Sequence, residues 1–327
     1  MADWLVEEGI GEERAVLLRH DRVIAARLHW PGFLTAGQVE DARLISRPGG
    51  SGRGVARFPN GEEALVDHLP RSASEGALLR LEVTRAAIPE AARRKLAKAR
   101  PTALPVRTAP SLAQQLQAEG FSSSVVRRFP ANVDWPEIWV NANEGRVSFA
   151  GGALLFYATP AMTLIDIDGE GKGFELAKSA VPVLVQALRK FDLAGSIGID
   201  FPTLSEKSQR KVIDALLADA LDDWPHERTA INGFGFVQLV SRMTRPSLLA
   251  RFMHDPAGAA ARRLLREAEG LHGAGAVELR CSPQVAAAMR SVWITELGRR
   301  TGRRVAVEVI GDRLDPSAGS AQLVPYD

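Results

Sequence analysis

Two short apolar segments, TLID and SIGID, each end in an aspartate, and a helix-like stretch fills the gap between them. The aspartates are Asp166 and Asp200, and apolar residues between 174 and 191 recur every three or four positions, which predicts an amphipathic helix. Pro182 lies within that helix and predicts a kink or a late start of its regular part. A strand, a helix and a second strand of this size form a right-handed crossover with parallel strands. The pattern therefore predicts an α/β fold in which both aspartates lie at the same edge of a sheet.

If the two strands are neighbours, their backbones lie ~4.8 Å apart. Two carboxylates at that spacing repel each other unless one is protonated or a cation lies between them. Strand alternation puts Asp168 on the same face as Asp166, which adds a third source of acidic oxygens. Mg²⁺ prefers such ligands. The alternative is structural, because aspartates at strand ends commonly cap the next helix or form an Asx turn.

A glycine-rich turn, GEGKG at 169–173, follows the first of these strands. Such a turn can present backbone N–H groups to a phosphate, and Lys172 would add positive charge. Neither the P-loop spacing nor the dinucleotide fingerprint is present, so a flexible turn is the better default interpretation. A nucleotide-binding α/β protein that uses this turn is therefore a further alternative.

The first 90 residues have a β pattern. Residues 4–30 predict a hairpin of two strands with a turn at 20–22, and short alternating segments follow up to Ile88, separated by PGGSG, PNG and a serine-rich turn. This spacing is typical of a small barrel of the OB type, although any small β-meander would give a similar pattern.

The segment 89–130 changes character, because it is rich in Ala, Arg, Lys and Pro. Its basic cluster includes Arg93, Arg94 and Lys95. Such a segment is either a solvated helix and linker or a surface that contacts phosphates.

The remainder of the second half alternates strands and helices. Ser205 is the expected N-cap of a helix that follows Asp200, and the region from 256 onward predicts a separate small α/β unit. The expected elements are strands at 153–157 and 163–168, a strand pair around 229–240, a helix at 258–269, a strand at 276–281, a helix at 283–300 and a strand at 304–310.

Composition restricts the class of protein. A formal charge of +2 from 41 basic and 39 acidic residues does not by itself indicate a polyanionic partner, so a nucleic-acid function would depend on local charge. The single cysteine, Cys281, excludes an internal disulfide and any zinc site made of several thiolates. Because we find neither a leader pattern nor a long apolar stretch, we expect a cytoplasmic protein without a membrane partner.

At the aspartates the chain resembles the ribonuclease E/G family. GGALLFYATPAMTLIDIDG resembles the family's glycine-rich strand and first aspartate, and LRKFDLAGSIGIDF resembles the segment that leads to the second. SQRKV, GFGFVQLVSRMTRPSL and the opening WLVEEGIGEERAVLLRHDRVIAARL are also similar to family segments. The similarity is strongest over 150–250, moderate over 1–90 and faint after 256.

The resemblance implies a ribonuclease-H-like subdomain with an inserted OB-fold module, followed by a DNase-I-like catalytic subdomain. It also implies Mg²⁺, or Mn²⁺, at Asp166 and Asp200, and internal cleavage of single-stranded RNA by a metal-activated water. The expected divisions are 1–35 and 131–160 for the ribonuclease-H-like part, 36–88 for the OB module, 89–130 for a basic linker or reduced 5′-monophosphate sensor, 161–252 for the catalytic part and 256–327 for a small α/β domain.

On this hypothesis Asp168, which stands where the family has asparagine, orients the attacking water. Lys172, Arg242 and Arg245 are candidate electrophilic helpers that bind the RNA phosphate. Arg93, Arg94 and Lys95 are candidate RNA contacts. The alternative is an RNA-binding paralogue that has lost efficient cleavage, which the shortened loop after Asp168 would permit.

The family's zinc-linking Cys-Pro-x-Cys element is absent near 253–256. We therefore expect no structural zinc, because a tetrahedral zinc site needs its full set of ligands. A homodimer without a zinc link remains a possible assembly.

Overall fold

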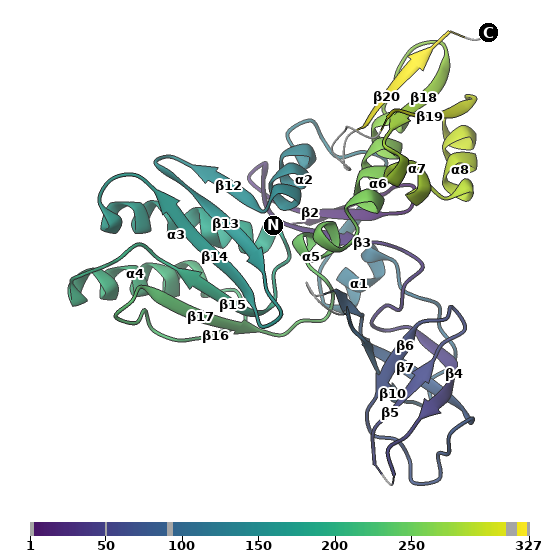
Figure 1. Ribbon diagram of the computed structural model, residues 1–327, viewed down its shortest axis with the longest axis horizontal. Coiled ribbons are helices and arrows are strands. Elements are labelled where there is room, and N and C mark those ends of the chain that lie inside the picture. The colour runs from purple at the N-terminus through teal and green to yellow at the C-terminus, as the bar shows by residue number, and fades with distance from the viewer. Residues whose placement is uncertain (1–2, 50, 90–93, 312–318, 326–327) are drawn as a thin grey trace.

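The computed structural model describes residues 3–49, 51–89, 94–311 and 319–325. Within these residues the chain forms four open sheets and one closed barrel. Figure 1 shows the largest sheet on the left, the barrel at the lower right and the carboxyl-terminal unit at the upper right. The expected α/β class with several subdomains is confirmed at this level. Arg93 lies outside the described residues.

The amino-terminal sheet has the order β11-β1-β2-β3. The expected hairpin is β2 and β3, and its turn residues His20 and Asp21 both have positive φ, 47° and 59°, as in tight two-residue hairpins. The sheet also contains two strands that the hairpin prediction did not include. Helix α1 packs beside it, capped by Ser111, whose hydroxyl accepts from the N–H of Gln114. The bounds are β1 Asp3–Glu8, β2 Glu13–Arg19, β3 Arg22–His29, α1 Leu112–Ala118 and β11 Ser123–Val126.

The barrel closes in the order β10-β6-β5-β4-β7, with β6 and β10 parallel. Its fifth strand, β10, lies beyond residue 88, in the segment expected to be a basic linker. Ala97 and Ala99 are buried in the barrel core while Lys98 and Arg100 are exposed, so this segment has the period of a strand. The bounds are β4 Val39–Ser46, β5 Gly54–Arg57, β6 Glu63–Val66, β7 Leu78–Arg85 and β10 Ala97–Pro101; the short pair β8 Ile88–Pro89 and β9 Arg94–Lys95 joins β7 to β10.

The largest sheet has the order β12-β13-β14-β15-β17-β16. Strands β14 and β15 are parallel and are joined by α3, as the crossover argument predicted. Helices α3 and α4 cover one face of this sheet (Figure 1), and α3 also contacts β3 of the amino-terminal sheet. The bounds are α2 Trp135–Glu144, β12 Arg146–Phe149, β13 Gly152–Ala158, β14 Thr163–Gly169, α3 Gly173–Lys190, β15 Gly195–Asp200, α4 Lys207–Ala220, β16 Glu227–Arg228 and β17 Phe236–Ser241.

Both helices expected around Asp200 are present, as α3 and α4. Pro182 lies inside α3, which runs as one helix from Gly173 to Lys190. The prediction that Ser205 caps α4 is wrong, because the N-cap is Glu206, with no side-chain cap hydrogen bond, and the helix begins at Lys207.

The carboxyl-terminal unit contains a sheet of order β19-β18-β20, with α6 packed against β18 and β20. The single helix expected at 283–300 is wrong, because Met289 and Arg290 both have extended backbone and divide it into α7 and α8. Arg266 bonds Glu7 at 2.5 Å, which ties the unit to β1. The bounds are α5 Leu248–His254, α6 Pro256–Glu269, β18 Ala276–Cys281, α7 Pro283–Ala288, α8 Ser291–Thr301, β19 Val305–Val309 and β20 Gly319–Val324.

Among the described residues, none of the helices has both the length and the apolar character needed to cross a bilayer.

Candidate functional site

Asp166 and Asp200 are register partners across the parallel pair β14 and β15. Directly paired residues on neighbouring strands have backbones ~4.8 Å apart. Ile165 and Ile199 point into the core beneath α3 and α4, so strand alternation puts both aspartates on the opposite face of the sheet. The crossover prediction that the two aspartates meet on one edge is therefore confirmed.

Asp168 lies two residues beyond Asp166 on the same face, at the carboxyl-terminal end of β14. Asp168 and Asp200 are exposed, and Asp166 is half-buried. Burial raises the pKa of Asp166, and the negative charges of Asp200 and Asp168 raise it further. The three carboxylates thus form one electrostatic group.

No positive side chain in the described part of the chain forms an ion pair with any of these three carboxylates. No set of three or more His, Cys, Asp or Glu side chains among the described residues is arranged to hold a metal ion directly. Mg²⁺, however, is typically bound through one or two carboxylates and keeps several waters. Two neighbouring carboxylates without a cationic partner fit that mode of binding.

Lys172 lies at the same edge as the aspartates. It is the exposed N-cap residue of α3, in the turn that follows β14. A Cβ on the next residue, Gly173, would lie 3.1 Å from the carbonyl oxygen of Thr203, so the turn packs against the segment that follows Asp200. Of the three candidate helpers, Lys172 is therefore the one at the same edge of the sheet as the carboxylates.

Arg242 and Arg245 lie elsewhere. Gly195, at the start of β15, pairs with Ser241, and the five residue-to-residue steps from Gly195 to Asp200 correspond to roughly 16 Å. Both arginines follow Ser241, so they lie at the opposite edge of the sheet from the aspartates. The structure does not bring them together with Asp166 and Asp200.

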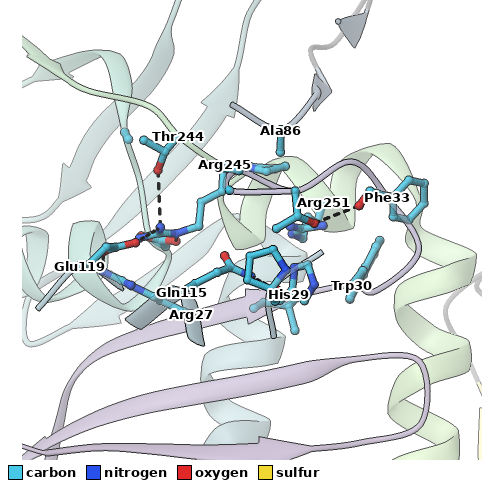
Figure 2. Close-up of a pocket in the computed structure, with 18 of the residues that line it drawn as sticks. Arg27, His29, Trp30, Phe33, Ala86, Gln115, Glu119, Thr244, Arg245 and Arg251 are labelled. Atoms are coloured by element: carbon cyan, nitrogen blue, oxygen red, sulfur yellow. Dashed lines mark hydrogen bonds and ion pairs between the residues drawn. The ribbon is translucent and has the colours of Figure 1, made fainter. Parts of the chain in front are cut away.

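Arg245 is part of an ion-pair network. Its Nε bonds Asp192 at 2.6 Å and its Nη1 bonds Glu119 at 2.7 Å, and Glu119 also pairs with Arg27 at 2.7 Å. Figure 2 shows Glu119 between the two guanidinium groups. Burial lowers the pKa of Arg245, but the two carboxylates outweigh it and hold that pKa above its usual value. Arg245 therefore joins α1, β3 and the turn before β15.

This network lies in a groove of about 1280 Å³, bordered by the barrel, the amino-terminal sheet and the edge of the large sheet. The backbone N–H of Ala86 donates to the carbonyl of Thr244 at 3.2 Å, which joins the barrel to this edge. Five arginines and four carboxylates line the groove, and Arg242 is exposed among them. The groove therefore carries charges of both signs and lies at the opposite edge of the sheet from the aspartates.

His29 also lines the groove and is buried (Figure 2). Burial and the positive charges of Arg251 and Arg245 lower the pKa of His29 to about 3, so it is neutral at physiological pH. No local sequence pattern points to this histidine, because its neighbours in the folded chain come from distant segments.

The basic segment is only partly a free positive surface. Arg94 and Lys95 form β9, and Lys95 is half-buried. Arg100 bonds Glu82 of β7 at 2.8 Å, and Arg107 lies 4.0 Å from the same carboxylate. Tertiary folding brings Glu82 to this basic segment from a neighbouring strand, which the local sequence does not indicate.

Sequence reasoning also missed two exposed aromatic residues beside the aspartates. Tyr157 is on β13, on the face of the sheet that carries Asp166, and Phe234 is in the loop before β17. The period-two pattern of β13 could have placed Tyr157 on that face.

No protein-family model matches this chain, and a search of the curated proteins finds no match.

Proposed function

We propose that the protein is a magnesium-dependent endoribonuclease that cleaves single-stranded RNA internally. The observation that carries this proposal is the direct pairing of Asp166 and Asp200, with Asp168 beside them. Among the described residues, no cationic side chain forms an ion pair with any of these three carboxylates. Such a set of carboxylates is costly unless a cation neutralises it. Its presence on an exposed face supports a metal-dependent reaction.

Asp166 and Asp200 are the residues that would hold Mg²⁺, with Mn²⁺ as a possible substitute. When bound, the ion supplies Lewis-acid stabilisation of the phosphoryl oxygens and lowers the pKa of a bound water. Asp168, which is exposed on the same face, can accept a hydrogen bond from the attacking water and orient it. Lys172 offers positive charge to the phosphate where negative charge develops.

RNA would be guided by the barrel and the groove. The barrel has five strands, with its third strand (β6) parallel to its fifth (β10), which supports an OB-type module of the kind that binds unpaired strands. Arg242 in the groove, together with Arg93, Arg94 and Lys95 of the basic segment, would contribute phosphate contacts. On this proposal the amino-terminal sheet belongs to a ribonuclease-H-like part and β14–β17 to a DNase-I-like part.

The protein would act in the cytoplasm, where one thiol stays reduced. Any homodimer would form without a zinc link, because the only cysteine, Cys281, is fully buried in the carboxyl-terminal unit.

A cleavage assay tests this proposal. Single-stranded RNA blocked at both ends should be cut internally with Mg²⁺, and each of Asp166→Asn and Asp200→Asn should abolish cleavage while RNA affinity persists. A matched control is Asp219→Asn, at an exposed helix position on α4. Absence of cleavage by the wild type with either Mg²⁺ or Mn²⁺ would contradict the proposal.

The second candidate function is RNA binding without cleavage. It is favoured by the separation between the arginine-containing groove and the aspartates, because a binding surface at the other edge of the sheet does not require them. A wild type that binds oligoribonucleotides and never cuts them would favour this second function.

A further inference from the structure

Phe234 is 88% exposed, the largest exposed fraction among the large hydrophobic side chains of the described residues. It lies in the sequence NGFG, between β16 and β17. Both neighbours are glycines, which carry no side chain that could cover the ring. Single exposed apolar residues are common on protein surfaces, so exposure alone does not indicate a function.

The loop that carries Phe234 is held in one conformation. The side-chain oxygen of Asn232 accepts from the backbone N–H of Phe234 at 2.9 Å and from that of Phe236 at 3.1 Å. The N–H of Gly235 donates to the carbonyl of Asn232 at 3.2 Å. A loop fixed by three hydrogen bonds presents the ring without the entropy cost of ordering it on binding.

The loop is also fixed to the strand that ends in Asp200. The N–H of Phe201 donates to the carbonyl of Gly235 at 3.1 Å, and Phe236 is the register partner of Asp200. Gly235 has a φ of +88°, and a Cβ there would lie 2.6 Å from the carbonyl oxygen of Phe201. Glycine is therefore required for this close approach. Phe234 is therefore two residues from Phe236, the register partner of Asp200.

The sheet beside Asp200 is adapted to a second phenylalanine. A Cβ on Gly198 would lie 2.5 Å from Cζ of Phe236, so the absence of a side chain at 198 leaves room for that ring. Phe236 is half-buried there, whereas Phe234 is left in solvent. Phe236, the first residue of β17, thus packs on the sheet, whereas Phe234 in the preceding loop is exposed.

We infer that Phe234 is a stacking platform for an unpaired nucleobase next to the scissile phosphate. This inference rests on the proposed function and adds the structural basis for its selectivity for single strands. Bases in a duplex have both faces covered by their neighbours, whereas an unpaired base can stack on an aromatic ring. A phenyl ring has no hydrogen-bonding group, so the subsite accepts any base.

The test measures binding and cleavage separately. Fluorescence of a short single-stranded RNA that carries 2-aminopurine at one of several positions reports stacking, and anisotropy without divalent ions reports affinity. Phe234→Ala should weaken binding about 10-fold and remove the fluorescence quenching at one position, because stacking of one base is lost. Phe234→Trp should preserve both signals.

The matched control is Val292→Ala, because Val292 is 64% exposed on α8 of the carboxyl-terminal unit. It should leave affinity and quenching unchanged, and both alanine variants should keep the wild-type Tm. Affinity for duplex RNA should be the same in wild type and Phe234→Ala.

The outcomes separate this inference from the proposed function. Cleavage by the wild type together with unchanged affinity and quenching in Phe234→Ala would refute the stacking subsite and leave the nuclease proposal intact. Loss of quenching in Phe234→Ala with no cleavage by the wild type would support the subsite and refute the nuclease. A wild type that does not bind single-stranded RNA would refute both.

Discussion

Asp166 lies directly opposite Asp200 on neighbouring parallel strands, and the pKa of Asp166 is raised by burial, by Asp200 and by Asp168. This arrangement keeps negative charges close together on one exposed face of the sheet. Binding sites often have such locally unfavourable arrangements, which the rest of the fold must stabilise.

Removing one charge should stabilise the protein in the absence of divalent ions. Asp200→Asn relieves repulsion with Asp166, so we expect its Tm in a chelator to rise by roughly 2 °C. Adding Mg²⁺ should raise the Tm of the wild type and leave that of the variant unchanged, because ligand binding to the folded state stabilises it. Differential scanning calorimetry measures both effects. A lower Tm for the variant in the chelator would contradict the repulsion.

The pH dependence of cation binding should shift when Asp168 is neutralised. Cation binding requires ionised Asp166, so affinity should rise with pH through the raised pKa of that carboxyl. Asp168→Asn removes one of the charges that raise the pKa of Asp166. The rise in Mn²⁺ affinity should therefore occur at lower pH in this variant than in the wild type. Titrations from pH 4 to 7 check this shift. A shift to higher pH, or none, would mean that Asp168 does not act on Asp166.

The arrangement of the aspartates could be predicted from sequence because it depends on local pattern and chain topology. Two apolar strands and a helix of suitable length fix a parallel crossover, and strand alternation fixes the faces. Neighbours brought together from distant segments could not be predicted in this way. Arg245 meets Glu119 only after folding, and Arg100 meets Glu82 across two barrel strands.

The missed boundaries have local causes. Strand β10 has an alternating pattern, but Lys98 and Arg100 made its sequence resemble a basic linker. The helix expected at 283–300 is broken at Met289 and Arg290, which both have extended backbone. No proline at the break signals this in the sequence.

Arg245 and Arg242 should behave differently when replaced. Arg245→Ala leaves the carboxylates of Asp192 and Glu119 without their shared cation, so we expect a loss of about 3 kcal/mol in the free energy of unfolding. Arg242 is exposed, so Arg242→Ala should keep wild-type stability and weaken RNA binding with a smaller salt dependence. Urea unfolding and salt-dependent binding titrations measure these effects. Equal stability of both variants would contradict the structural role of Arg245.

His29 should make the fold sensitive to acid. Its pKa is about 3 in the folded protein and near 6.5 when unfolded, so the unfolded chain binds the proton first as pH falls. The stability associated with neutral His29 is present above pH ~6.5 and is lost towards pH 3, at about 1 kcal/mol for each pH unit. His29→Asn should show a smaller loss of unfolding free energy between pH 6.5 and 4. The exposed His272, replaced by Asn, is the matched control. A decline as steep in His29→Asn as in the wild type would show that other groups cause it.

The proposed site requires that Asp166 and Asp200 together hold one divalent cation. Electron paramagnetic resonance of added Mn²⁺ measures this directly without dependence on activity. We predict about one tightly bound Mn²⁺ per wild-type chain, competed by Mg²⁺, and none in either Asp166→Asn or Asp200→Asn. Mn²⁺ binding that survives in either variant with wild-type affinity, or no binding by the folded wild type, would contradict the claim.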